Sequence, residues 1–179
     1  SAGAHLAAMM MAARWHDYDP GLPADLVKAG ILMSGLYDLD PVRYAEFVNV
    51  DLKITEANAL RLSPGYMPQP HPIPFITSVG DLESSEFKRQ TALIASQWRS
   101  SHQADIALQG INHLTICDMF ALRGHPLFEQ SCKLIANSTR VSGNLNNTND
   151  LTRQALTRLI GGLPMLLVQK TCGQEYFTQ

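Results

Sequence analysis

The stretch Ile73–Val79 reads I-P-F-I-T-S-V and is followed by Gly80. It is short and apolar and lies between a proline-rich segment and a glycine, which predicts a buried strand. From Ser84 the hydrophobic residues recur at helical spacing, and a further apolar run, A-D-I-A-L at 104–108, predicts the next strand. The residues expected on the apolar face of the helix between them are Phe87, Thr91, Ile94 and Trp98. Strand, helix and strand in this order predict parallel strands with flanking helices in an α/β sheet.

The regions on either side extend this pattern. Residues 27–33 (V-K-A-G-I-L-M) predict another buried strand, and 126–136 another helix. Residues 36–70 are irregular, with two weak helical pieces at 41–49 and 55–61. An Ala- and Met-rich helix is expected at 2–14. Its predicted apolar face comprises Leu6, Met9, Met10 and Ala13.

The domain organisation follows from the length and from a change in composition. A chain of 179 residues and 19.7 kDa fits one domain with a sizeable core, which we place at 1–137. Asparagines and Ser142-Gly143 then predict a polar linker, and 138–179 would form that linker and a short amphipathic tail of unknown role. A helix is expected near 151–160.

Charge and cysteine content exclude several classes of protein. Fourteen Lys and Arg against 16 Asp and Glu give a net charge of −2, so the chain has no basic field for nucleic acid. No apolar run approaches the roughly 20 residues of a membrane helix. Three scattered cysteines, Cys117, Cys132 and Cys172, predict reduced thiols in a cytoplasmic protein, and no zinc-ligand spacing is present.

Ser1–Gly3 reads S-A-G, which matches the second half of the nucleophile elbow G-x-S-x-G. In that motif, small residues on both sides of the serine allow a sharp turn that pushes its hydroxyl outward. The tripeptide alone is common, and an ordinary serine at a helix start gives the same pattern.

Two acids and a histidine follow the predicted strands. Asp81 and Glu83 come after the strand at 73–79, and His113 comes after the strand at 104–108 in Q-G-I-N-H-L. Each alone fits a solvated loop or turn residue. Together with Ser1 they follow the chain order Ser, acid, His of the α/β hydrolases, and strand ends meet at one edge of a parallel sheet. The residues therefore predict a hydrolytic triad and leave Asp81 and Glu83 both open as its acid.

Several longer segments resemble one family. They are S-A-G-A-H-L at 1–6, S-G-L-Y-D-L at 34–39, Ser63-Pro64, V-G-D-L-E-S-S-E-F at 79–87 and Arg89-Gln90. Over about residues 1–136 the chain resembles the α/β-hydrolase esterases of the kynurenine formamidase (arylformamidase) type. The resemblance implies the C-terminal part of an α/β-hydrolase fold, from the nucleophile elbow to the C-terminal helix.

The family motifs assign roles to individual residues. The acid of that family stands three residues after the glycine of its G-x-x-[DE]-S-x-E-F motif, which implies Glu83, with Asp81 as the alternative acid. The family histidine, in a motif like D-H-F, falls on His113, although here Asn112 precedes it and Leu114 follows it. Ser1 would be the nucleophile, and the Ala2 backbone N–H at a helix start would be an oxyanion donor.

The resemblance also implies the reaction and its setting. The expected substrate is an N-formyl amide related to N-formylkynurenine, or a small carboxylic ester, cleaved through an acyl-enzyme in tryptophan catabolism. No cofactor and no metal are expected, and the small-molecule acyl or formamide substrate is the expected partner. Neither nucleic acid nor membrane is expected to bind, and a homodimer is left open.

Two other readings remain beside this one. An N-terminal nucleophile hydrolase would use the free amine of Ser1 as its base, but such folds begin with a strand and this chain predicts a helix. A non-catalytic hydrolase remnant or interaction module, inactive as an isolated fragment, is the alternative from a different class. The usual loop with further oxyanion donors precedes the serine in this fold, so we expect the chain to be a portion of a longer hydrolase.

Overall fold

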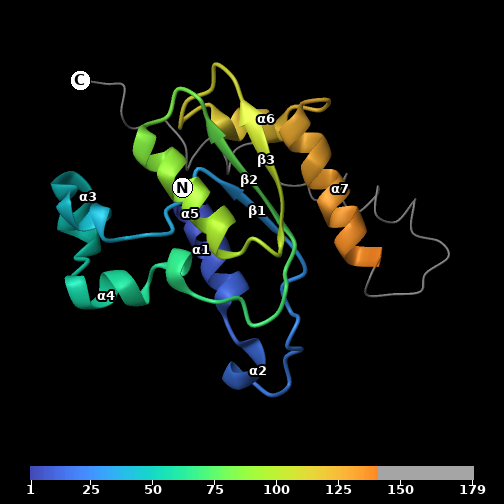
Figure 1. The fold of residues 1–179 in the computed structure, drawn as a ribbon, viewed down its shortest axis with the longest axis horizontal. Coiled ribbons are helices and arrows are strands. Elements are labelled where there is room, and N and C mark those ends of the chain that lie inside the picture. The colour runs from blue at the N-terminus through green and yellow to red at the C-terminus, as the bar shows by residue number, and fades with distance from the viewer. Residues whose placement is uncertain (141–179) are drawn as a thin grey trace. The chain divides into compact units, whose positions relative to one another are not determined.

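The computed structural model describes residues 1–140, in which helices flank a small sheet (Figure 1). The strands are β1 (Gly30–Met33), β2 (Phe75–Gly80) and β3 (His102–Leu108). The helices are α1 (Ala2–Ala12), α2 (Trp15–Tyr18), α3 (Glu46–Leu52), α4 (Glu56–Arg61), α5 (Ser85–Gln97), α6 (Ile116–Ala121) and α7 (Pro126–Arg140), with 3₁₀ turns η1 (Pro41–Tyr44) and η2 (Pro64–Tyr66). Residues Ser1–Ser138 form one compact unit. The predicted tail helix at 151–160 lies outside the described residues.

The three strands are parallel and ordered β1-β2-β3, which confirms the predicted α/β architecture. Ile31 pairs with Ile76, and Ile76 pairs in turn with Ala104. Because all strands run the same way, their carboxyl ends share one edge of the sheet. The crossover from β2 to β3 runs through α5, as parallel pairing requires.

The elements predicted within residues 1–140 exist, but their ends differ. The first strand begins at Gly30 rather than at residue 27, because its ladder starts where the Gly30 N–H donates to the Pro74 carbonyl (3.0 Å). Pro74 has no N–H to continue the ladder. β3 begins two residues earlier than predicted and α7 ends four residues later. The sequence analysis missed α6, whose 6 residues are too few to show a helical period.

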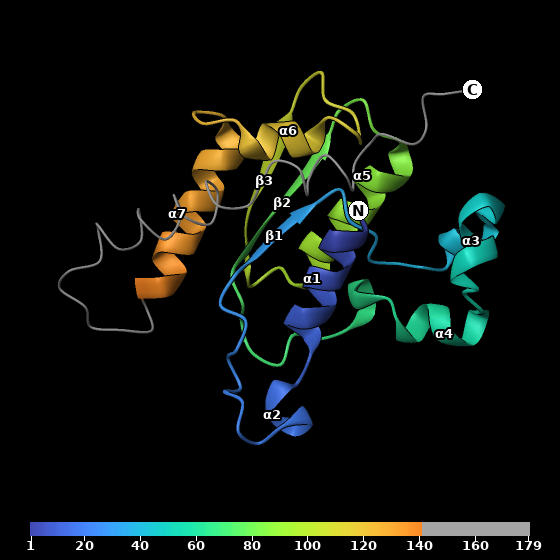
Figure 2. The same ribbon diagram turned by 180° about the vertical axis from the view of Figure 1, so that it is seen from behind.

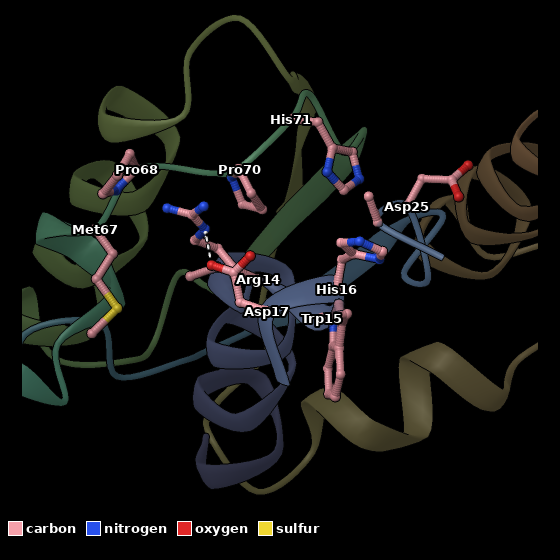
Figure 3. Close-up of a pocket in the computed structure, with 11 residues that line it drawn as sticks. Arg14, Trp15, His16, Asp17, Asp25, Met67, Pro68, Pro70 and His71 are labelled. Atoms are coloured by element: carbon pink, nitrogen blue, oxygen red, sulfur yellow. Dashed lines mark ion pairs between the residues drawn. The ribbon is translucent and has the colours of Figure 1, made fainter. Parts of the chain in front are cut away.

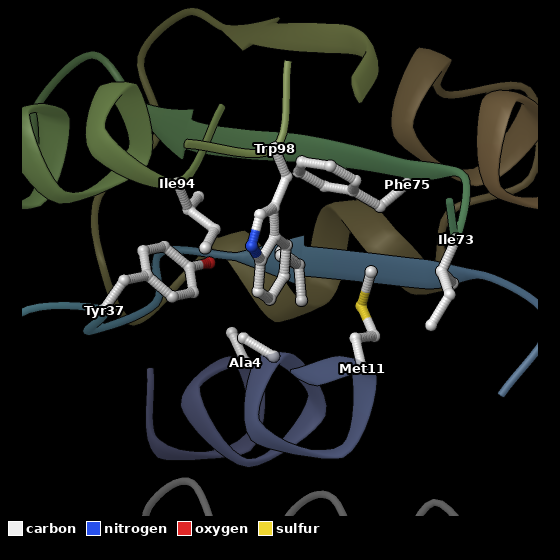
Figure 4. Close-up of a cluster of buried hydrophobic side chains, with 9 residues drawn as sticks. Ala4, Met11, Tyr37, Ile73, Phe75, Ile94 and Trp98 are labelled. Carbon is white, nitrogen blue, oxygen red and sulfur yellow. The ribbon is translucent and has the colours of Figure 1, made fainter. Parts of the chain in front are cut away.

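One face of the sheet packs against α1 and α5, as the cluster in Figure 4 shows. Phe75 and Trp98 meet edge to face, with ring centroids 5.8 Å apart and planes at 88°. Trp98 is a core residue, as predicted, and its indole N–H donates to the Met67 carbonyl (2.7 Å). The indole therefore buries its ring without losing its hydrogen bond.

The predicted apolar face of α1 is wrong. Its buried residues are Ala4, Ala8 and Met11, whereas Leu6 is 61% exposed and Met10 is 39% exposed. Alanines face the sheet because the helix lies close to β1: a Cβ added at Gly30 would stand 2.3 Å from the Met11 sulfur. Because α1 lies close to β1, small side chains fit on its buried face. The spacing of the hydrophobic residues in the sequence does not reveal this distance.

The opposite face of the sheet packs against α6 and α7, which lie on the other side of the strands in Figure 2. Ile76, Ile106 and Leu108 supply the strand residues of this cluster, and Leu127 and Leu134 supply those of α7. Side chains alternate between the two faces along each strand. β1 and β2 are covered on both faces, whereas Gln103, Asp105 and Ala107 of β3 are exposed. This rigid frame fixes the loops at the strand ends, where the candidate site lies.

Candidate active site

The predicted site residues all lie near the carboxyl ends of the strands. Asp81 and Glu83 lie in the turn between β2 and α5, and His113 lies in the loop after β3. Ser1 is the N-cap of α1, and its side chain makes no capping hydrogen bond. The serine hydroxyl is therefore available to other partners.

Three predicted residues form a continuous hydrogen-bonded chain. Ser1 Oγ lies 3.2 Å from His113 Nε2, and His113 Nδ1 lies 2.7 Å from Glu83 Oε2. The residues come from positions up to 112 apart in the sequence, yet each contact is direct. Exposure to solvent falls from the serine to the acid: Ser1 is exposed, the His113 side chain is 33% exposed and the Glu83 side chain is fully buried.

Glu83 is held through both of its carboxylate oxygens. While Oε2 faces the imidazole, Oε1 accepts hydrogen bonds from the Ser34 hydroxyl (2.5 Å) and from the Gly80 N–H (2.8 Å). A buried carboxylate needs such donors to remain charged. These contacts fix the rotamer of Glu83 and aim Oε2 at the histidine.

Asp81, the alternative acid, points elsewhere. Its Oδ1 accepts hydrogen bonds from the backbone N–H groups of Gly110 (2.7 Å) and Ile111 (3.3 Å). Its carboxylate therefore anchors the loop that carries His113, and the imidazole contact belongs to Glu83.

The loop around His113 is shaped by its neighbours. The Asn112 side-chain carbonyl accepts the N–H groups of Leu114 (2.9 Å) and Thr115 (3.1 Å). An aspartate accepts the same bonds, so Asn112 in place of the family aspartate keeps this turn. Leu114, the other departure from the family motif, is 64% exposed.

Phe87 covers the histidine ring from α5. The two rings stack with centroids 4.2 Å apart and planes at 28°. This contact restricts rotation of the imidazole while both of its nitrogens keep their partners. The negative face of the phenyl ring also suits an imidazole that takes up a proton.

The Ala2 N–H begins helix α1, so it has no acceptor within its own helix. It immediately follows Ser1, and the positive end of the helix dipole lies there. A negative oxygen bound next to Ser1 Oγ would therefore meet a favourable field.

Two of the motifs that carry the resemblance contact each other. Gln90 is fully buried, and its Oε1 accepts the N–H groups of Tyr37 (2.7 Å) and Asp38 (2.8 Å). Asp38 forms an ion pair with Arg89 (2.8 Å). The segment after β1 is thus fixed to α5, next to the turn that holds Glu83.

Tyr37 packs in the core rather than lining a pocket. Its side chain is fully buried. Burial raises the pKa of this phenol well above its usual range. His5 likewise has a local structural role, because its Nε2 lies 2.9 Å from the Leu62 carbonyl oxygen.

Sequence reasoning missed Ser34, Gly80 and Phe87 as parts of this site. Ser34 and Phe87 lie in the motifs that carry the resemblance, but nothing in their spacing shows what they contact. Their roles depend on the register of β1 against β2 and on the docking of α5, which only the folded chain shows.

A hollow of about 960 Å³ lies away from this site (Figure 3). Its lining includes Arg14, His16, Asp17, Met67 and His71, at the end of α1 opposite to Ser1. Arg14 and Asp17 form an ion pair there (2.7 Å). The hollow therefore takes no part in the Ser1–His113–Glu83 arrangement.

Two kinds of feature are absent from residues 1–140. No helix in this range combines the length and apolar character that crossing a bilayer requires. No group of three or more His, Cys, Asp and Glu side chains in the same range is placed to hold a metal ion.

The chain is similar in sequence to known proteins. No family model matches it. It is 30% identical to a kynurenine formamidase of Salmo salar over 146 residues, covering 77% of this chain and 48% of that protein. A kynurenine formamidase of Danio rerio is 48% identical over 64 residues, which are 36% of this chain and 20% of that protein. The chain thus spans about half the length, or less, of these relatives.

A solved structure supports the architecture. A crystal structure from Silicibacter sp. TM1040, of a protein provisionally named a thioesterase, matches with a TM-score of 0.55. The match covers 70% of this chain and 45% of the other chain. Because the two sequences are only 22% identical, this likeness shows the fold alone. The sequence identities carry the family relationship: over the matched residues, this chain is a homologue of the kynurenine formamidases.

Proposed function

We propose that the chain is a serine hydrolase that cleaves an N-formyl amide or a small carboxylic ester through Ser1, His113 and Glu83. The observation that carries this proposal is the unbroken line of contacts from a helix-capping hydroxyl through an imidazole to a buried carboxylate. Nucleophile, base and orienting acid have these relations in acyl-transfer enzymes on several unrelated folds.

In the first step, Ser1 Oγ attacks the carbonyl carbon of the substrate while His113 Nε2 takes the hydroxyl proton. Glu83 Oε2 accepts from Nδ1–H, so it holds the ring with Nε2 free to act as base, and it stabilises the imidazolium that forms. The developing oxyanion meets the Ala2 N–H at the start of α1. His113 then gives its proton to the leaving amine or alcohol as the carbon–nitrogen or carbon–oxygen bond breaks.

In the second step, water attacks the formyl or acyl ester on Ser1. His113 takes a proton from this water and returns it to Ser1 Oγ as the acid leaves. The products are formate and a free amine from an N-formyl amide, or a carboxylic acid and an alcohol from an ester. The partial exposure of His113 and the exposure of Ser1 support this reaction, because a small substrate and water can reach both side chains.

The choice of an N-formyl amide as substrate rests on the relatives. The two proteins that match in sequence are named kynurenine formamidases, whereas the fold neighbour is named for thioester cleavage. All of these reactions pass through a tetrahedral oxyanion on an acyl carbon, which the same three side chains serve.

The test is labelling and turnover by the purified chain. A fluorophosphonate probe should label the chain at Ser1, and hydrolysis of N-formylkynurenine and of p-nitrophenyl acetate should be measured, with formate quantified for the former. Ser1→Ala should abolish labelling and lower kcat/KM by at least about 10⁴-fold, because removal of a triad nucleophile leaves only binding and oxyanion effects.

Ser85→Ala is the matched control. Ser85 is an exposed serine at the start of α5, so its loss should change neither labelling nor turnover. Labelling that persists in Ser1→Ala, or turnover by the parent chain no faster than that of Ser1→Ala, would overturn the proposal. The second result would favour a non-catalytic homologue.

A further inference from the structure

We infer that Ser34 is a positioning residue: its hydroxyl holds the buried Glu83 carboxylate in the orientation and charge state that His113 needs. The inference deepens the proposed function and, for its bearing on turnover, rests on it. It starts from a contact that no sequence motif predicts. Ser34 Oγ donates to Glu83 Oε1 across 49 positions of sequence, and both side chains are buried.

Among the described residues, Ser34 is the only one whose side chain donates a hydrogen bond to Glu83 Oε1. The other donor to that oxygen is the Gly80 backbone N–H (2.8 Å), while Oε2 serves His113 (2.7 Å). Removing the Ser34 hydroxyl would leave one backbone donor on Oε1. The carboxylate would lose part of the stabilisation of its charged form and gain freedom to rotate away from the ring.

The backbone at Ser34 supports a specific need for a hydroxyl. Its φ is +46°, in the left-handed region that glycine adopts most readily, and its N–H donates to the Ser78 carbonyl (2.9 Å). The glycine of this segment is the next residue, Gly35, so the position with the positive φ is occupied by a serine. A side chain with a Cβ at this φ costs conformational energy, and here the side chain provides the hydroxyl that donates to Glu83.

The ionisable groups near Glu83 have hydrogen-bond partners of their own. His113 faces it from the loop after β3, and Asp81 in the same turn directs its carboxylate to the amides of Gly110 and Ile111. Lys88 on α5 donates to the Asp81 carbonyl (2.7 Å), and Ser1 reaches Glu83 only through the imidazole. Ser34 is therefore a neutral donor whose removal alters the Glu83–His113 pair without removing a charge.

The expected effect on that pair has one direction. Loss of a donor to the carboxylate strengthens its hold on a proton and also on an imidazolium beside it. Whichever group carries the proton, the pair should bind it more tightly. The acidic limb of the pH profile of kcat/KM should therefore move to higher pH.

The experiment compares Ser34→Ala and Ser34→Gly with the parent chain. Both remove the hydroxyl, but glycine relieves the positive φ while alanine keeps a Cβ there. Both variants should shift the acidic limb equally and lower kcat about tenfold with little change in KM, although Ser34→Gly should melt at the higher temperature. Ser78→Ala removes a neighbouring buried hydroxyl that has no hydrogen-bond partner within residues 1–140, so its pH profile should match that of the parent.

A second measurement is independent of turnover. In chain labelled with ¹⁵N-histidine, the titration midpoint of the His113 ring should move to higher pH in both Ser34 variants and not in Ser78→Ala. If the Ser34 variants keep the parental midpoint, or Ser78→Ala shifts it equally, the inference is wrong. A shifted midpoint in a chain without turnover would uphold the role of Ser34 toward Glu83 and reject the hydrolase function.

Discussion

At the scale of single residues, the site depends on a close approach between β2 and the loop that carries His113. A Cβ added at Gly80 would stand 2.1 Å from the Ile111 carbonyl oxygen and 2.7 Å from its carbon. The same Gly80 donates its N–H to Glu83 (2.8 Å). A glycine at this position thus lets the acid and the histidine loop meet, because any side chain would push the loop away.

Gly80→Ala should therefore damage activity more than stability. The loop around Ile111 must shift, and overpacking of this kind costs about 1–3 kcal/mol of unfolding free energy. A displacement of about 1 Å at His113, two residues further on, should lower kcat/KM about 10²-fold. Urea unfolding followed by circular dichroism and steady-state hydrolysis measure the two effects.

Gly21→Ala is the control for this substitution. Gly21 is exposed in a turn, and its added Cβ would meet only the flexible Asp19 side chain, at 3.2 Å. It should change neither property. Parental kcat/KM in a folded Gly80→Ala chain would show that the His113 loop tolerates displacement.

At the scale of elements, α5 organises the site although it lies between two strands in the sequence. It contributes Phe87 against the imidazole, and Gln90 to the segment that follows β1. Gln90 uses its amide fully: besides its two acceptor bonds, Nε2 donates to the Asp38 carbonyl and to Glu86 Oε1, both at 2.8 Å. The buried Gln90 side chain thus provides the hydrogen-bond partners that the backbone of Tyr37 and Asp38 would have in a regular helix or strand.

Gln90→Leu should destabilise the chain strongly. It keeps the volume but leaves the buried N–H groups of Tyr37 and Asp38 without an acceptor, and each such group costs about 1–3 kcal/mol. We expect a loss of about 2–5 kcal/mol of unfolding free energy, measured by urea denaturation.

Gln97→Leu on the same helix provides the comparison. Gln97 is exposed and makes one longer bond to the Met67 carbonyl (3.3 Å), so its loss should stay within about 0.5 kcal/mol. Equal losses for the two variants would mean that Gln90 does not fix the segment after β1.

At the scale of the whole molecule, the sequence was sufficient for the order of elements and not for their docking. The apolar runs at 27–33, 73–79 and 104–108 predicted three strands because short, largely apolar runs bounded by turn residues are typical of strands in an α/β sheet. The buried face of α1 was predicted wrongly, since it depends on the distance between α1 and β1.

The candidate site divides in the same way. Ser1, Glu83 and His113 were predicted from motif and chain order, because a parallel sheet brings strand ends to one edge. Ser34 was not predicted, since its hydroxyl reaches Glu83 only through the register of β1 against β2. Which acid faces the histidine also depended on the turn geometry, which directs Asp81 to backbone amides.

The stability of the whole molecule at low pH should depend on the ion pairs of Arg89 with Glu86 and Asp38. The Arg89 guanidinium donates to both oxygens of Glu86, at 2.8 Å each, and also to Asp38. The hydrogen bond from Arg89 holds the pKa of Glu86 below its usual value near 4.5, although partial burial opposes this. A carboxyl with a depressed folded pKa stabilises the native state above its unfolded pKa, and the contribution is lost as pH falls through the folded pKa.

Glu86→Gln should therefore be less stable than the parent at pH 6–7, and the difference should vanish near pH 3. Glutamine keeps an oxygen acceptor for Gln90, so the change isolates the charge. Because the Glu86 side chain is 40% exposed, solvent limits the difference to about 1 kcal/mol or less. Urea unfolding at several pH values between 3 and 7 measures it, with Glu56→Gln as control because Glu56 is 89% exposed and lies 3.7 Å from Arg43. A difference that stayed constant or grew as the pH fell would contradict the depressed pKa of Glu86, because its charge would then not be the source of the stability.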